Sequence, residues 1–160
     1  MGKVLSDFLP GWPGTVSRAV DDIIVALPNA ESSTSLQPGT AVTLSDDGKG
    51  IKYWRSAKTA DDFLGIIVRS PSRTPAAYGA NTAAVAPGEM AEVITRGSVI
   101  VTLEDGVPDP GDPVYIVKST GGFATDADSG SNLKLNGVHF RGVADADGNI
   151  EIVLNERNVL

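Results

Sequence analysis

Short apolar stretches separated by turn-forming residues run along most of the chain. TAVTLS (40–45) alternates strictly and places Val42 and Leu44 on one face, which is the period of a half-buried strand. MAEVIT (90–95) and SVIVTLE (98–104) give the strongest pattern of this kind. Further stretches with strand character lie at 15–30, 51–54, 63–69, 113–118, 133–135, 137–144 and 150–155. The pattern predicts about nine or ten short strands, which is typical of a β-sandwich or β-barrel.

Three segments admit more than one structure. Arg96-Gly97 is either the connection of a tight hairpin or a bulge within one long strand, because glycine permits the positive φ that both need. The stretch 16–27 favours a strand, but Asp21-Asp22 would also suit the first turn of a helix. SAKTADD (56–62) has the composition of a helical turn.

Composition supports an all-β fold. The chain has 18 Gly and 10 Pro, which suit turns and interrupt helices, and its 17 Val and 10 Ile together outnumber its 11 Leu. Its 160 residues suffice for one domain with a substantial core. We therefore expect residues 15–160 to form a single β-rich domain, a jelly-roll-like sandwich or barrel.

An extended arm is predicted at the N-terminus, over residues 1–14. Its sequence FLPGWPG contains too many Pro and Gly residues for a helix or a central strand. Large apolar side chains are costly to leave in water, so they dock either on another subunit or back on the core of their own subunit. The candidate contact residues of the arm are Phe8, Leu9, Trp12 and Pro13.

Two long segments are predicted to be loops. The stretch 70–89 consists mostly of small or turn-forming residues, and 119–132 is similar. A long loop in a small domain usually has a function. The first is either a contact loop anchored by Tyr78 or a surface insertion.

Charge and residue usage exclude several classes of protein. The chain has no Cys and a single His, so thiolate metal sites, disulfides and His-rich metal centres are excluded. A net charge of −7 disfavours binding to nucleic acid, and no apolar run is long enough to span a membrane. The N-terminus does not resemble a signal peptide, so synthesis in the cytoplasm is expected. We predict no enzymatic activity and no cofactor.

Three motifs with possible chemistry have simpler explanations. His139 lies between apolar residues of a predicted strand and is expected to be structural. Asp145-Ala-Asp147-Gly-Asn149 resembles the start of a calcium loop, but Ile150 stands where such a loop needs Gly, so an acidic turn is expected. The first six residues fit a short myristoylation pattern that nothing else in the chain supports.

The order of these features resembles the structural cement, or capsid decoration, proteins of tailed bacteriophages. The resemblance extends from about Thr15 to Leu154. Its clearest parts are RGSV (96–99) leading into a strand, GDPVY (111–115) and the closing stretch 140–151. These are turn-and-strand patterns and contain no catalytic signature.

The resemblance implies a structural protein on the outer surface of a phage head, made in the cytoplasm of the bacterial host. Such proteins bind the major capsid protein, bridge its subunits and stabilise the mature head. They act as homo-oligomers, either dimers or trimers. The acidic composition agrees with an outer position, away from the packaged DNA.

Two other classes of function remain open from the sequence. A receptor- or carbohydrate-binding module on the virion surface would need exposed aromatic residues, for which Tyr53, Trp54 and Tyr78 are candidates. A small hydrolase would need His139 or a pair of carboxylates as its general base.

Overall fold

The computed structural model describes residues 11–55, 58–70 and 83–155. Nine strands form one continuous sheet, and the helices of these ranges are two 3₁₀ turns of three residues each. None of the helices there is long and apolar enough to cross a membrane. The strands are β1 (Val16–Pro28), β2 (Ala41–Leu44), β3 (Ile51–Tyr53), β4 (Gly65–Ile67), β5 (Met90–Asp105), β6 (Pro113–Val117), β7 (Phe123–Ala124), β8 (Asn132–Phe140) and β9 (Asn149–Leu154), and the turns are η1 (Ala60–Asp62) and η2 (Asp128–Gly130). The all-β prediction is confirmed.

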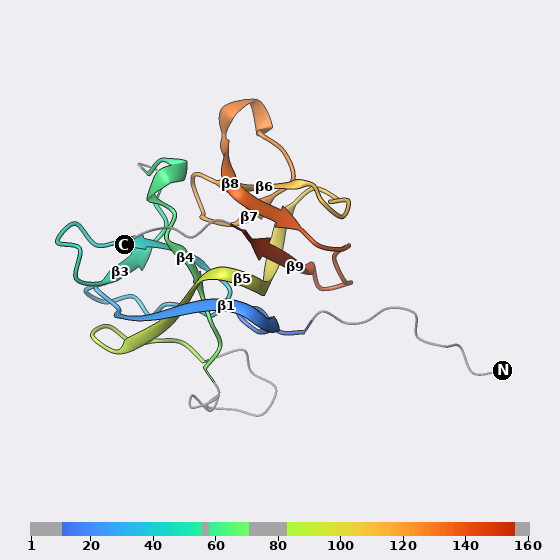
Figure 1. Ribbon diagram of the computed structural model, residues 1–160. Helices are drawn as coiled ribbons and strands as arrows, with labels where there is room; N and C mark the ends of the chain where they lie inside the picture. The colour runs from blue at the N-terminus through green and yellow to red at the C-terminus, as the bar shows by residue number, and fades with distance from the viewer. Residues whose placement is uncertain (1–10, 56–57, 71–82, 156–160) are drawn as a thin grey trace.

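The long strand β5 links two groups of strands (Figure 1). Its second half pairs with β9 through Thr102 and in parallel with β7 through Leu103. β7 pairs with β6, β6 with β8, and β8 with β9. These pairings return to β5 and close a five-stranded barrel, which buries its own apolar core around Ile116, Phe140 and Ile152.

The first half of β5 belongs to a second ring, which also has five strands but a smaller core. Here β5 pairs with β1 and with β4, β4 pairs with β2, and β2 pairs with β3. A parallel bridge between Asn29 and Ile51 connects β3 back to the end of β1. This ring has a core of its own, which includes Leu36, Val42 and Val93. The sheet is therefore barrel-like at both ends of β5.

Gly97 lies within one long strand, β5, and is not a hairpin turn; the register of β5 with β1 shifts on either side of Arg96. β5 continues through Gly97, pairing with β1 on one side and with β9 on the other. Gly97 has φ +119°, and a Cβ here would overlap with Oδ1 of Asp22. Burial raises the pKa of the Asp22 carboxyl above its ordinary value. The hairpin alternative is wrong, and so is the helix alternative for 16–27, because β1 occupies that stretch.

Two other segments differ from the pattern-based prediction. The stretches 133–135 and 137–144 form one strand, β8, which ends at Phe140 and accommodates Gly137 at φ +65°. The predicted loop 119–132 contains β7 and η2. The helical turn expected within 56–62 is present as η1.

Candidate functional site

Trp12 is a large, exposed aromatic side chain at the edge of the folded domain. Its side chain is 53% exposed, and the guanidinium carbon of Arg69 lies 5.8 Å from the centroid of its ring. The separation is that of a cation–π pair. Trp12 and Arg69 together form what we call the Trp12 platform.

The backbone beneath Trp12 is fixed to the domain. The N–H of Gly14 donates a hydrogen bond to the carbonyl of Ile100 (2.7 Å). The carbonyl of Gly14 accepts one from the backbone N–H of Arg69 (2.8 Å). A turn bond from Thr15 N–H to the Trp12 carbonyl (3.0 Å) completes the connection. Residues 11–14, the last part of the predicted arm, are therefore held by hydrogen bonds on both sides.

Two glycines pack face to face under the platform. Gly14 and Gly39 both have φ +82°, which favours glycine. A Cβ on Gly14 would lie 2.6 Å from Cβ of Pro38, and one on Gly39 would lie 2.6 Å from Cβ of Pro13. This close approach presents Trp12 to solvent from a rigid base.

Arg69 has hydrogen-bonding capacity that the described part of the chain does not use. Its Nε and Nη2 atoms are buried, and neither has a hydrogen-bond partner. Burial lowers the pKa of this guanidinium from its ordinary value. Arg96, in contrast, uses the same two nitrogens to bind the Asp21 carboxylate, at 3.0 and 2.7 Å. Arg69 therefore keeps two donors enclosed within the domain without a partner among the described residues.

A shallow cavity of about 240 Å³ lies next to Pro13. Its wall includes Tyr53, whose hydroxyl donates to the carbonyl of Ser35 (2.9 Å), and Glu104, which accepts a hydrogen bond from the Thr120 hydroxyl (2.5 Å). These polar groups are already paired within the chain. The cavity thus extends the surface beside the Trp12 platform and contains no reactive group.

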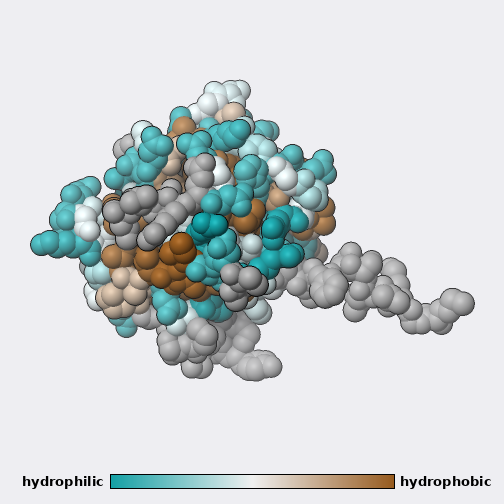
Figure 2. All heavy atoms as spheres, viewed as in Figure 1, coloured by the Kyte–Doolittle hydropathy of each residue, from teal (hydrophilic) through white to brown (hydrophobic). Residues whose placement is uncertain are grey.

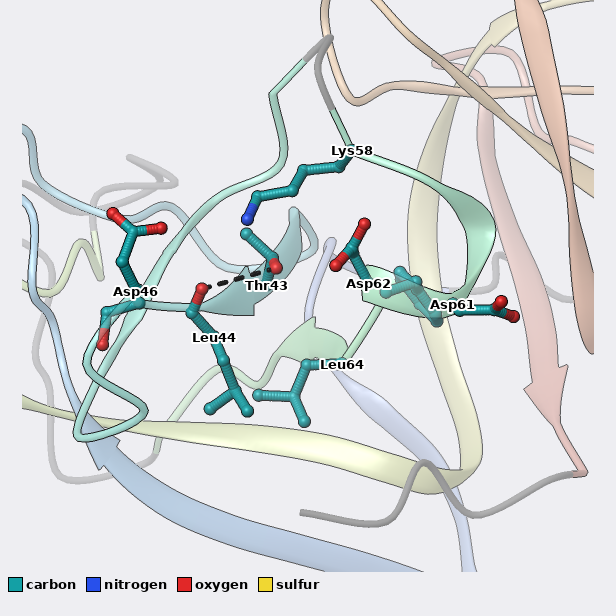
Figure 3. Close-up of a pocket in the computed structure, with 9 residues that line it drawn as sticks. Thr43, Leu44, Asp46, Lys58, Asp61, Asp62 and Leu64 are labelled. Atoms are coloured by element: carbon teal, nitrogen blue, oxygen red, sulfur yellow. Dashed lines mark hydrogen bonds between the residues drawn. The ribbon is translucent and has the colours of Figure 1, made fainter.

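A second hollow of about 230 Å³ lies between β2 and η1 (Figure 3). Figure 3 shows Lys58 extending toward Thr43, with Asp46 and Asp62 on opposite sides of it. The Asp62 carboxylate accepts hydrogen bonds from the N–H (2.7 Å) and hydroxyl (2.8 Å) of Thr59, which lower its pKa. Asp62 therefore caps η1 and is ionised at neutral pH, which does not suit a general acid.

The remaining candidates for chemistry have structural surroundings. His139 is half-buried on β8, and its Nδ1 lies 3.4 Å from the amide nitrogen of Asn155. The Asp145 carboxylate accepts hydrogen bonds from the backbone of Asp147 (2.9 Å) and Asn149 (2.8 Å), so it shapes the acidic turn before β9. Within 11–55, 58–70 and 83–155, no three His, Cys, Asp or Glu residues are grouped to hold a metal ion.

The predicted contact residues divide into two groups. Trp12 and Pro13 lie together at the platform, whereas Phe8, Leu9 and Tyr78 lie outside the described residues. Arg69 is the component that the sequence interpretation missed. In the sequence, Arg69 is a cationic residue directly after the apolar stretch 63–68. Many strands end in this way, so the pattern did not single out Arg69.

The aromatic residues considered for carbohydrate binding are poorly placed for stacking. Trp54 is only 4% exposed and packs against Phe63 in the core, with ring centroids 6.5 Å apart. Tyr53 is half-buried, and its hydroxyl is bonded within the chain. The third candidate, Tyr78, lies outside the described residues. Trp54 and Tyr53 therefore do not offer exposed rings on which a sugar could stack.

Comparison with protein families gives a match over nearly the whole chain. Residues 2–154 match the model of the XM1 gp53 minor capsid protein family. The chain belongs to this family. Membership gives the minor capsid protein described here a structural role in a phage capsid and a place in the virion.

A solved structure agrees with this assignment at the level of the fold. A chain in "The capsid of Myoviridae Phage XM1" superposes with a TM-score of 0.73 at 22% sequence identity, and the match covers 96% of each chain. A comparison with curated proteins gave no match. The predicted relation to phage capsid proteins is confirmed.

Proposed function

We propose that this minor capsid protein is a structural cement. It binds the outer surface of the phage head, bridges neighbouring subunits of the major capsid protein and stabilises the mature shell. The observation that supports this most strongly is the family match over residues 2–154. The net charge of −7 agrees with a position outside the shell, because an acidic protein is repelled by the packaged DNA.

The Trp12 platform is the proposed centre of the contact with the capsid. Trp and Arg are the residues most enriched among those that dominate binding energy at interfaces. The rigid base of Trp12 reduces the entropy lost on binding. The major capsid protein would cover the exposed Trp12 ring, which lies against the Arg69 guanidinium. Phe8, Leu9 and Tyr78 are proposed as further contacts around this centre.

Stabilisation of the shell then follows from mass action. A ligand that binds only the mature shell stabilises it by RT ln(1 + [L]/Kd), which is about 2.7 kcal/mol per site at a hundredfold excess over Kd. A shell offers many equivalent sites, so a modest contribution at each one is sufficient.

Co-sedimentation with expanded and unexpanded heads of the encoding phage tests the proposal. We expect saturable binding to expanded heads alone. Trp12→Ala should weaken this binding at least thirtyfold, which corresponds to about 2 kcal/mol for a central contact. Val143→Ala is the matched control, because Val143 is 68% exposed on the loop after β8 and should bind normally. Absence of binding by the wild-type protein would contradict the cement role.

A truncation separates the arm from the platform. Removal of residues 1–10 leaves the hydrogen bonds of Gly14 in place, whereas removal through residue 14 would delete them. If Phe8 and Leu9 are contacts, the shorter deletion should weaken binding to heads without lowering thermal stability. Undiminished binding would restrict the contact to the folded domain.

A further inference from the structure

The outer edge of β1 has no partner strand in the described part of the chain. β1 pairs with β5 along one side, from Val16 to Pro28. Its connection to β3 begins only at Asn29, so the edge from Val16 to Leu27 is without a neighbouring strand in the described ranges. An edge of this kind presents backbone N–H and C=O groups that can pair with another chain.

The second half of this edge lacks the charged residues that protect its first half. Charged residues and bulges discourage edge-to-edge pairing, and β1 has both at Asp21 and Asp22, where its register with β5 shifts. The following stretch, Ile23–Leu27, contains no charged residue, and its pairing with β5 is regular from Ile24 onward, after a last register shift between Ile23 and Ile24. We call this stretch the open edge.

One face of the open edge is also apolar and exposed. Ile24 is 43% exposed, and Ala26 beside it on the same face is exposed as well. Met90, opposite Pro28 on β5, also lies on this face and is 53% exposed, while Glu92, opposite Ala26, places an exposed charge beside it. Figure 2 shows a hydrophobic patch at the position of β1 in Figure 1. Exposed apolar side chains grouped in this way along a strand are typical of an interaction surface.

We propose that the open edge pairs with the open edge of a second copy of this chain, in antiparallel orientation about a two-fold axis. With Val25 on the axis, Ile24 lies opposite Ala26 of the second copy, and Ile23 lies opposite Leu27. Asp22 then lies opposite Pro28, so no carboxylate of one copy faces a carboxylate of the other.

The self-complementarity of the open edge is the reason for proposing a second copy of the chain as its partner. The apolar stretch is matched by itself in the antiparallel register, and the charges at its start fall beyond the apolar stretch of the partner. The pairing would add backbone hydrogen bonds between two edges and cover Ile24 and Ala26 on both copies. The proposal concerns the protein alone and does not depend on the proposed binding to the capsid.

Sedimentation velocity of the purified protein over about 1–100 µM, a usual range for weak dimers, tests the proposal. We expect a dimer whose dissociation constant rises at least tenfold in Ile24→Lys, because a charge at the centre of the edge blocks pairing. Val107→Lys is the control, since Val107 is 90% exposed on the loop after β5 and should not alter association. A wild-type monomer over this range, or a dimer unaffected by Ile24→Lys, would overturn the proposal.

The absence of cysteine makes a covalent test specific. In the double variant Ile24→Cys with Ala26→Cys, each new thiol would lie opposite its counterpart across the axis, at the Cα separation of about 4.5–5.5 Å that a disulfide accepts. The two thiols of one chain are about 7 Å apart along the strand, so they do not pair with each other. Mild oxidation should produce a covalent dimer. An oligomer that forms no such cross-link would place the interface elsewhere and overturn the proposed register.

Discussion

Gly39 is the residue on which the position of Trp12 depends most directly. Its φ of +82° is unfavourable for other residues, and an added Cβ would lie 2.6 Å from Cβ of Pro13. Gly39→Ala therefore combines backbone strain with overpacking. We expect it to lower the free energy of unfolding by about 2–4 kcal/mol in urea denaturation. Binding to heads should fall as well, because the base of the Trp12 platform is displaced.

Gly48→Ala separates the two contributions to that loss. Gly48 has φ +68°, but a Cβ added to it would meet nothing within 4 Å. Only the backbone penalty applies, so a loss of about 1 kcal/mol is expected. Equal losses in the two variants would contradict the close packing of Gly39 against Pro13.

The candidate site shows what a sequence reveals at the scale of single residues. Trp12 was identifiable because Pro and Gly surround a large aromatic residue that a regular strand would not accommodate. Arg69 was not identifiable, because its significance comes from a ring contributed by a distant part of the chain. Trp54 shows the converse, since its burial against Phe63 depends on how the two rings of strands pack.

At the scale of elements, Asn29 holds the second ring of strands together. It is 2% exposed, and its amide nitrogen donates to the carbonyls of Thr34 (3.0 Å) and Val85 (2.9 Å). Its side-chain oxygen accepts a hydrogen bond from Glu31 N–H (2.9 Å). Asn29→Ala would leave these buried groups unpaired. We expect it to lower the free energy of unfolding by about 2–4 kcal/mol, measured by urea denaturation.

Asn29→Asp is the informative comparison for that prediction. It preserves the shape of the side chain and the acceptor for Glu31, but it removes both donors and places a carboxylate near the two carbonyls. It should therefore destabilise the protein at neutral pH at least as much as Asn29→Ala. A variant as stable as the wild type would show that this network does not close the ring.

The elements that the sequence predicted well are those with local signals. Strands β2 and β9 follow from their alternating residues, and η1 from its composition. The continuity of β5 through Gly97 was undecided, because a hairpin and a bulge both favour glycine there and the choice depends on pairing with β1 and β9. β7 has only two residues, and its pairing with β5 and β6 comes from distant segments.

At the scale of the whole molecule, the two proposals together predict how the protein binds a head. A dimer joined at the open edge carries two Trp12 platforms, so a second contact with the same shell is intramolecular. Such bivalency strengthens apparent binding by about 10²–10⁴ when both sites can be reached together. Ile24→Lys leaves the platform intact and removes only the bivalency.

We therefore expect Ile24→Lys to bind expanded heads at the same saturating copy number as the wild type but with at least tenfold weaker apparent affinity and faster dissociation. Trp12→Ala should remain dimeric and lose affinity through the contact itself. Titration of labelled protein onto heads, followed by dilution, measures both properties. Equal affinity for Ile24→Lys and wild type would show that each copy binds the shell independently, even if the free protein is a dimer.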